Sequence, residues 1–135
     1  MPPEKPTDQS DVEDRLLASI ELVGAAQACA LLRIETDDPE GAMQAIVRDD
    51  AIIALVHDGR TVFPRCQFDV GKGRVFDVVS TILKRRTARI SNLRLCYWLT
   101  RAHVDFGEAP AQRFGHDDTA ILAAFRRYIE PNCHG

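Results

Sequence analysis

The sequence lacks the features that mark membrane-spanning and exported chains. No apolar run approaches the roughly 20 residues that a helix needs to cross a bilayer. Residues 1–10 are polar and contain three prolines, whereas a signal peptide would place an apolar stretch there. We therefore expect a cytoplasmic protein that does not associate with membranes.

Closely spaced cysteines are missing as well. Cys29, Cys66, Cys96 and Cys133 lie much farther apart than the paired ligands of a zinc site. Cys133 is followed by His134, but nothing nearby completes a ligand set, so we expect no metal and no other cofactor. Cys29 and Cys96 fall within apolar helical patterns, which predicts buried free thiols in a reducing compartment.

Arrangements typical of catalysis are also absent from the sequence. The four histidines fall in predicted turns, loops or the C-terminal tail, and none neighbours a nucleophile or carboxylate in a pattern that names a reaction. The pair Asp117-Asp118 suits a helix cap better than acid–base chemistry. The loop at residues 70–73 has two glycines but not the spacing of a phosphate-binding loop. We predict that the protein is not an enzyme.

The charge is distributed unevenly along the 135 residues. The net charge is −3, but residues 1–50 carry four basic and twelve acidic side chains, while residues 51–135 carry thirteen basic and eight acidic ones. Two interpretations remain open. Halves of opposite sign can help each other to dock or dimerise, or each half can meet a different partner.

Hydrophobic spacing predicts a mainly α fold. Residues 1–9, rich in proline and charge, are expected to form a disordered leader. Helices are predicted over residues 10–23, 25–32, 39–49, 75–83, 91–99 and 117–129. Their expected caps are Ser10 in a capping box with Glu13, Asp38 before Pro39, Ser91, and Asp117 or Asp118.

The helices over residues 25–32 and 39–49, joined by a turn, have the outline of a helix-turn-helix. After them, two β-rich runs at residues 52–56 and 61–63 flank Asp58-Gly59, a strong hairpin signal. Pro64 should end the second strand and leave a small wing. We therefore divide the chain after the leader into a helix-turn-helix-like region with a hairpin, residues 10–69, and a C-terminal helical region, residues 70–135.

The helix predicted over residues 39–49, which would be the recognition helix, carries few positive charges to contact duplex DNA. It offers Gln44 and Arg48, set among Glu40, Asp49 and Asp50, although phosphate neutralisation supplies most nonspecific affinity. The most basic stretch of the sequence is Lys84, Arg85 and Arg86. These side chains could contact DNA phosphates, remain solvated at a helix end where they interact favourably with the helix dipole, or contact an acidic face of another protein. We expect the isolated protein to bind DNA weakly.

Two motifs carry a family resemblance. Phe63-Pro64-Arg65-Cys66-Gln67-Phe68-Asp69 follows an Asp-Gly-Arg hairpin, and Tyr97-Trp98-Leu99-Thr100 precedes Phe106-Gly107-Glu108-Ala109-Pro110. In this order, over about residues 20–130, they resemble bacterial Xre/MbcA/ParS-type antitoxins. The chain departs from the family where Glu108 follows Gly107, because the family loop usually carries two glycines.

The resemblance implies an antitoxin of a type II toxin–antitoxin system. Its partner would be a RES-domain toxin that acts on NAD or transfers ADP-ribose, and its C-terminal region would block the toxin's cleft. The helix-turn-helix would regulate the shared operon, and the protein would form a homodimer or a larger complex with the toxin. The residues that we assign to toxin binding are Tyr97, Phe106, Gly107, Pro110, Arg126, Arg127 and Tyr128.

Alternatives remain for several of these assignments. Arg126 and Arg127 also suit a solvated helix C-terminus, where cations interact favourably with the helix dipole. Trp98 and its neighbour Tyr97 point in different directions on a helix, so we predict Trp98 in the core and Tyr97 on the surface. At the level of the whole protein, the alternative function is a winged, excisionase-like transcription regulator.

Overall fold

The computed structural model describes residues 14–87 and 90–130, and about half of them are helical. A helical segment covers residues 14–19. The named helices are α2 (Ala25–Leu31), α3 (Pro39–Arg48), α4 (Asp77–Arg85), α5 (Asn92–Thr100) and α6 (Asp118–Ile129), with short 3-10 turns η1 (Arg65–Gln67) and η2 (Pro110–Arg113). The strands are β1 (Leu22–Val23), β2 (Leu55–His57), β3 (Arg60–Pro64), β4 (Phe68–Asp69) and β5 (Arg74–Val75).

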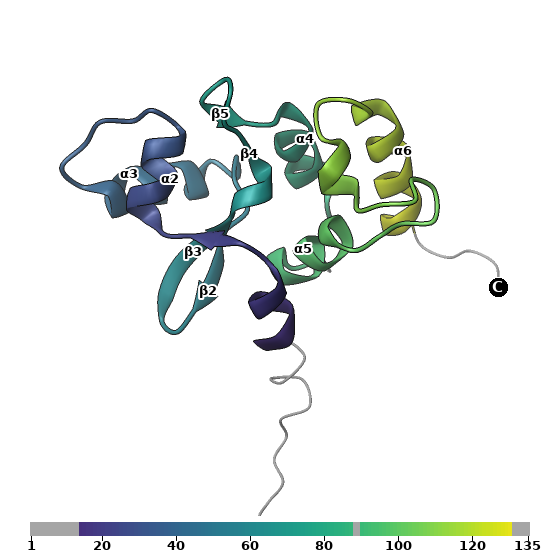
Figure 1. The fold of residues 1–135 in the computed structure, drawn as a ribbon, viewed down its shortest axis with the longest axis horizontal. Coiled ribbons are helices and arrows are strands. Elements are labelled where there is room, and N and C mark those ends of the chain that lie inside the picture. Colours follow the sequence, from purple (N-terminus) through teal and green to yellow (C-terminus); the bar gives the residue numbers. More distant parts are fainter. Residues whose placement is uncertain (1–13, 88–89, 131–135) are drawn as a thin grey trace, which may run out of the picture.

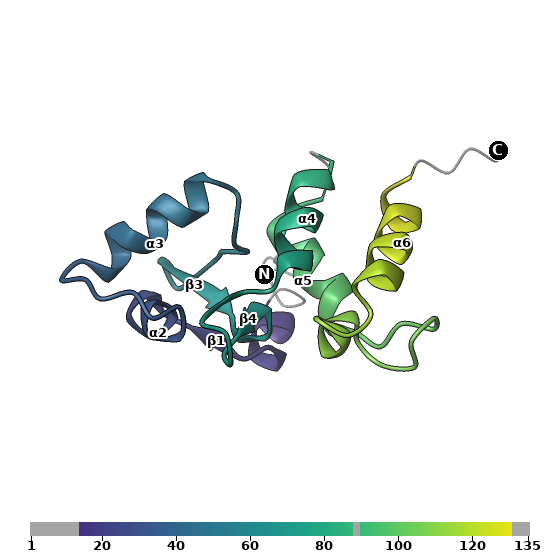
Figure 2. The same cartoon turned by 90° about the horizontal axis from the view of Figure 1, so that it is seen from above.

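The fold is mixed α/β, with about half of the described residues helical and two small antiparallel sheets. Of these sheets, the expected mainly α class included only the hairpin that forms part of the first. One has the strand order β1-β3-β2, and the other pairs β4 with β5. Figure 1 shows α2, α3 and the β2–β3 hairpin on one side of the molecule and α4, α5 and α6 on the other. Seen from above, α4 stands between α3 and α6 (Figure 2).

The predicted helix over residues 10–23 is wrong in its last four residues. The helical segment ends at residue 19, and Leu22 and Val23 instead pair with Pro64 and Phe63 of β3. The helical pattern failed here because Val23 is buried through this strand pairing, at 3% exposure, and not through a helix face. The proposed capping residues Ser10 and Glu13 lie outside the described residues.

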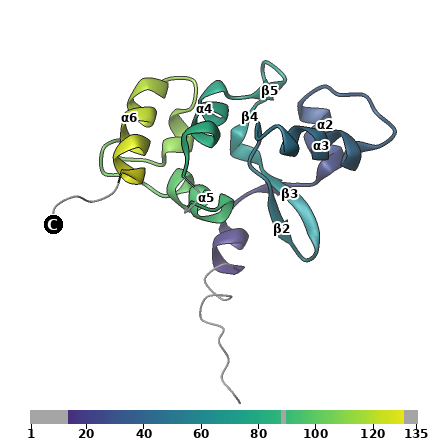
Figure 3. The same ribbon diagram turned by 180° about the vertical axis from the view of Figure 1, so that it is seen from behind.

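The hairpin is confirmed, with a shorter first strand than expected. Leu55 lies opposite Val62 in its register. Asp58 and Gly59 have φ of 55° and 75°, the two left-handed positions of a type I′ turn, which matches the twist of the flanking strands. Figures 1 and 3 show this hairpin projecting away from the helices. Residues 52–54, expected in its first strand, lie before β2.

Helix boundaries follow local capping chemistry. The Asp38 carboxylate accepts a hydrogen bond from the Gly41 N–H at 3.1 Å, and the Ser91 hydroxyl accepts one from the Arg94 N–H at 3.1 Å, so both predicted caps are confirmed. At the start of α6, Asp117 occupies the expected N-cap position, but its side chain accepts no N–H of the helix. Asp118, the first residue of α6, accepts a hydrogen bond from the Gly115 N–H at 2.7 Å, ahead of the helix. The helix predicted over residues 75–83 begins later, at Asp77, because residues 74–75 pair with β4.

Two hydrophobic cores hold the fold together. The N-terminal core contains Val23, Ala28, Cys29, Met43, Ile52, Phe63 and Phe68. The C-terminal core contains buried side chains of α4, α5 and α6, among them Ile82, Leu95, Trp98, Ile121 and Phe125, together with Leu17, Ile53 and Leu55. Neighbouring residues, Ile52 and Ile53, thus belong to different cores. None of the described helices has the length and apolar character needed to cross a membrane.

Gln67 fixes the segment between the two cores. Its side chain is fully buried, and its amide oxygen accepts a hydrogen bond from the Ile53 N–H at 2.7 Å. Its amide nitrogen donates to the carbonyl oxygens of Ile53 at 2.9 Å and Pro64 at 3.1 Å. The Gln67 side chain therefore makes the two backbone hydrogen bonds to Ile53 that a neighbouring strand would otherwise make. This explains how Ile53 can be buried without belonging to a sheet.

We expect Gln67→Leu to lower the free energy of unfolding by about 3 kcal/mol, because it strands buried polar groups of Ile53 and Pro64 that cost about 1–3 kcal/mol each. Chemical denaturation of both proteins measures the change. Gln27→Leu, on the exposed face of α2, is the matched control and should cost little. A loss below 1 kcal/mol for Gln67→Leu would show that the amide is not needed to hold this segment.

Candidate partner-binding surface

An aromatic cluster forms where the end of α5 meets the end of α6. Tyr128 stacks on Trp98 with ring centroids 5.4 Å apart and an interplanar angle of 23°. The His103 and Trp98 rings pack edge to face with their centroids 5.6 Å apart, and the centroids of the His103 and Phe106 rings are 5.4 Å apart. Trp98 is 9% exposed and Tyr97 is 41% exposed, which confirms the predicted division between core and surface.

The loop between α5 and η2 covers this cluster. It turns back on itself through a bridge between His103 and Glu108, in which the His103 N–H donates to the Glu108 carbonyl at 3.0 Å. The Gly107 N–H donates to the His103 carbonyl at 2.9 Å, and Gly107 has a φ of 71°. A glycine is favoured at this turn because other residues are strained in the left-handed region.

Arg113 ties the loop to α6. Its guanidinium donates to Glu108 at 2.8 Å, to Asp117, and to the Phe106 carbonyl at 3.3 Å. These two carboxylates raise the pKa of Arg113, first through the hydrogen bond to Asp117 and then through that to Glu108. On the far side of the loop, Arg127 of α6 pairs with Asp105. The loop is therefore held by charged groups at both ends.

Five of the seven residues assigned to toxin binding meet at this surface. They are Phe106 and Gly107 of the loop, Arg127 and Tyr128 of α6, and Tyr97, which lines one hollow together with Trp98 and Tyr128. Pro110 is buried at the start of η2 and has a structural position. Arg126 lies elsewhere, since it pairs with Glu130 and lines a hollow between α4 and α6 together with Arg85.

The residues assigned to DNA binding fall into two separate groups. Gln44 and Arg48 are exposed on α3. Lys84 and Arg85 are exposed at the end of α4, whereas Arg86 is less exposed, donates to Asn92 and pairs with Asp50 at 3.4 Å. The predicted basic stretch therefore offers two exposed cations, and its third cation is engaged within the protein.

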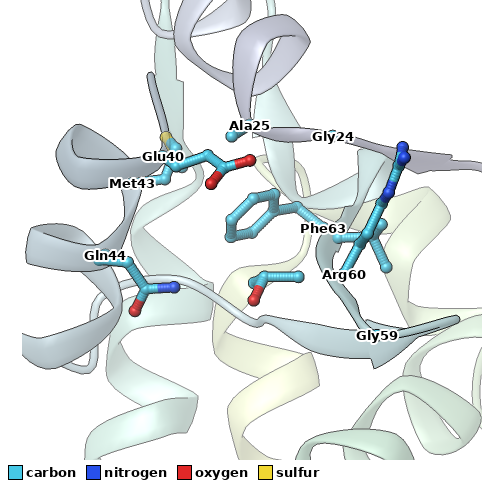
Figure 4. Close-up of a pocket in the computed structure, with 10 residues that line it drawn as sticks. Gly24, Ala25, Glu40, Met43, Gln44, Gly59, Arg60 and Phe63 are labelled. Atoms are coloured by element: carbon cyan, nitrogen blue, oxygen red, sulfur yellow. The ribbon is translucent and has the colours of Figure 1, made fainter. Parts of the chain in front are cut away.

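A hollow of about 430 Å³ separates α3 from the hairpin. Figure 4 shows Glu40, Met43 and Gln44 of α3 on one side of it, Arg60 of the hairpin on the other, and Phe63 between them. Met43 and Phe63 are each only 1% exposed, so they belong to the N-terminal core. The charged groups around this hollow are of both signs, and the hollow is not a concentrated cation site.

Burial controls the chemistry of the thiols. It raises the pKa of Cys66 to about 11 and that of Cys96 to about 12, and the nearby Cys66 adds to the latter shift. Burial also raises the pKa of Cys29. All three are free and protonated near neutral pH, which disfavours nucleophilic roles. Within residues 14–87 and 90–130, no three His, Cys, Asp or Glu side chains gather as metal ligands; Cys133 and His134 lie outside them.

No protein-family model, curated protein or solved structure matches the chain.

Sequence reasoning missed the charged residues that organise the surface. Arg113 has an i,i+4 relation to Asp117, a signal that the sequence does contain, but its bond to Glu108 depends on the folded loop. His103 was assigned only to a loop, and nothing local indicates its place against Trp98. Arg101, whose guanidinium carbon lies 4.5 Å from the Tyr97 ring centroid, was also missed.

We expect Arg113→Met to loosen the loop without unfolding the helices. Losing the two carboxylate contacts should raise amide hydrogen exchange at His103 and Gly107 about tenfold, the change that corresponds to about 1.4 kcal/mol of local stability. Exchange measured by mass spectrometry or NMR gives the result. Arg126→Met is the control, because it removes only the exposed pair with Glu130. Equal exchange in both variants would contradict the role given to Arg113.

Proposed function

We propose that the protein is an antitoxin, a binding protein without enzymatic activity, that neutralises a RES-domain toxin by direct contact and occlusion of its active site. The observation that carries the proposal is the convergence of Tyr97, Phe106, Arg127 and Tyr128 from α5, the following loop and α6 onto one surface. Tyrosine and arginine are enriched among the residues that dominate binding energy. The residue order that resembles Xre/MbcA/ParS-type antitoxins supplies the class of partner.

The geometry suits a rigid binding surface. Two contacts already restrict the side chains of α6: Tyr128 stacks on Trp98, and Arg127 pairs with Asp105. Side chains that are fixed before binding lose less conformational entropy when the partner binds. Arginine forms strong, directed hydrogen bonds to carboxylates and phosphates. Placed at the mouth of a cleft that binds NAD, Arg127 and its aromatic neighbours would occupy space needed by the nucleotide. A homodimer or a larger complex with the toxin belongs to the same proposal.

A second candidate is a winged, excisionase-like transcription regulator. One observation favours it: the type I′ hairpin lies beside α2 and α3, as a wing would. Gln44 of α3 lines the hollow between α3 and this hairpin (Figure 4). Against it, the exposed carboxylates of Glu35, Asp37 and Glu40 surround the same helices. Negative groups at this surface oppose the phosphate contacts on which DNA affinity depends.

We expect the chain to copurify with the RES-domain protein encoded beside its gene and to restore growth when the two are co-expressed. Arg127→Glu and Phe106→Ala should each weaken the complex about 30-fold, the effect of losing about 2 kcal/mol at a central contact. Isothermal titration calorimetry measures the affinities. Arg126→Glu is the matched control and should bind as the unmodified chain does.

Failure of the unmodified chain to bind such a protein would contradict the antitoxin proposal. Point variants are better tests than deletion of α6, because Ile121 and Phe125 of that helix are at most 1% exposed in the C-terminal core.

We expect the isolated chain to bind duplex DNA from its own upstream region with a Kd of about 10⁻⁶ M or weaker at 0.15 M salt, the range of nonspecific binding. Fluorescence anisotropy with labelled upstream and scrambled duplexes should give similar affinities. A nanomolar and sequence-specific affinity would favour the regulator instead. A toxin complex that presents several copies can still gain affinity through avidity.

A further inference from the structure

Two neighbouring hollows flank the exposed Tyr97 and share its side chain and that of Arg101. One, of about 440 Å³, lies between the helical segment 14–19 and α5 and is lined by Arg15, Leu16, Ser19, Tyr97, Thr100 and Arg101. The other, of about 330 Å³, lies toward α6 and is lined by Arg94, Tyr97, Trp98, Arg101, Ala102, His103 and Tyr128. Figures 1 and 3 show the segment 14–19 beside α5. The second hollow thus joins the aromatic cluster to a surface made partly by the beginning of the chain.

Positive charge gathers at these hollows. Arg15, Arg94 and Arg101 contribute side chains, and no carboxylate lines either hollow. Among the described residues, none of the three arginines forms an ion pair, whereas Arg113, Arg126 and Arg127 all do. Arg101 instead lies over the Tyr97 ring, 4.5 Å from its centroid. The arginines around Tyr97 are therefore available to carboxylates supplied by another molecule.

The floor between these cations is apolar and aromatic. Leu16, which is half-buried, lines the first hollow, Trp98 lines the second, and the Tyr97 side chain lines both. Stacking of Arg101 on Tyr97 holds a guanidinium in place while leaving its N–H groups free for a carboxylate. Such a surface fits an acidic segment whose apolar side chain enters a hollow while its carboxylates meet the arginines.

We infer that the partner-binding surface extends from the aromatic cluster across Tyr97 to the segment 14–19, and that it takes a carboxylate-rich segment of the partner protein with an apolar side chain among its acids. This inference rests on the proposed function and adds to it the chemistry of the partner and a contribution from the beginning of the chain. A nucleic-acid strand fits less well, because it needs a continuous basic track, whereas Arg15 is preceded by the exposed Asp14.

The test measures the affinity of the full chain for the RES-domain protein encoded beside its gene. Arg94→Glu and Arg101→Glu should each weaken binding at least about tenfold, and Arg15→Glu by about three- to fivefold, mainly through slower association. The unmodified complex should weaken between 0.05 and 0.3 M salt, and the double variant R94E/R101E should lose most of that dependence. Arg48→Glu is the matched control, since Arg48 is also an exposed helix arginine without an ion pair among the described residues.

The outcomes separate the two proposals. No binding by the unmodified chain would overturn the proposed function and this inference with it. Strong binding that R15E, R94E and R101E leave equal to R48E would overturn the inference alone. The same would follow if R94E and R101E abolished binding of a labelled dT20 oligonucleotide while leaving toxin binding unchanged. Circular dichroism of each variant checks that the helices persist.

Discussion

The buried amide of Gln67 is the contact on which the arrangement of the two cores depends. A chain segment that passes between two cores must bury its backbone, and each buried N–H and C=O needs a partner. Gln67 supplies both partners of Ile53 and also binds the Pro64 carbonyl. The turn η1 brings this amide to the segment, since Pro64 ends β3 immediately before it. One glutamine therefore ties the end of β3 to the segment that precedes β2.

The position of Ile53 has consequences for the candidate surface. Ile52 packs in the N-terminal core, and Ile53 packs in the C-terminal core, which also contains Leu17 and buried side chains of α4, α5 and α6. Packing of Leu17 places the segment 14–19 beside α5, and Arg15 of that segment then lines the same hollow as Tyr97. Arg15 and Tyr97 thus share a surface because Leu17, two residues after Arg15, belongs to the same core as the buried side of α5.

Local signals in the sequence predicted much of the fold. Asp58-Gly59 identified the hairpin, Asp38 and Ser91 identified helix starts, and adjacent Trp98 and Tyr97 were divided correctly between core and surface. Each of these depends on a few neighbouring residues. The Phe63–Asp69 motif was recognised as unusual, and Gln67 gives it a physical reason, although the partner of that amide lies fourteen residues earlier.

What the sequence could not supply depends on distant contacts. Leu22 and Val23 continue a plausible helical pattern, and only their pairing with β3, some forty residues later, makes them a strand. The surface shows the same limit. Tyr97, Phe106, Arg127 and Tyr128 were predicted individually. The contacts of His103 with Trp98 and of Arg113 with Glu108, which organise this surface, depend on the folded loop. Arg15 meets Tyr97 only in the tertiary structure.

The uneven charge of the chain can now be interpreted through its ion pairs. Within the described residues, two pairs join an acid of the first fifty residues to a base of the later part, Glu21 with Arg65 and Asp50 with Arg86. The other pairs lie within the later part, so internal docking uses little of the opposite charge. Exposed acids remain around α3, and the arginines around Tyr97 form no ion pair with the residues that the structure describes. Docking of the two halves within one chain therefore accounts for little of the opposite charge, and most of it is left for contacts with other molecules, whether a second copy of the chain or a different partner.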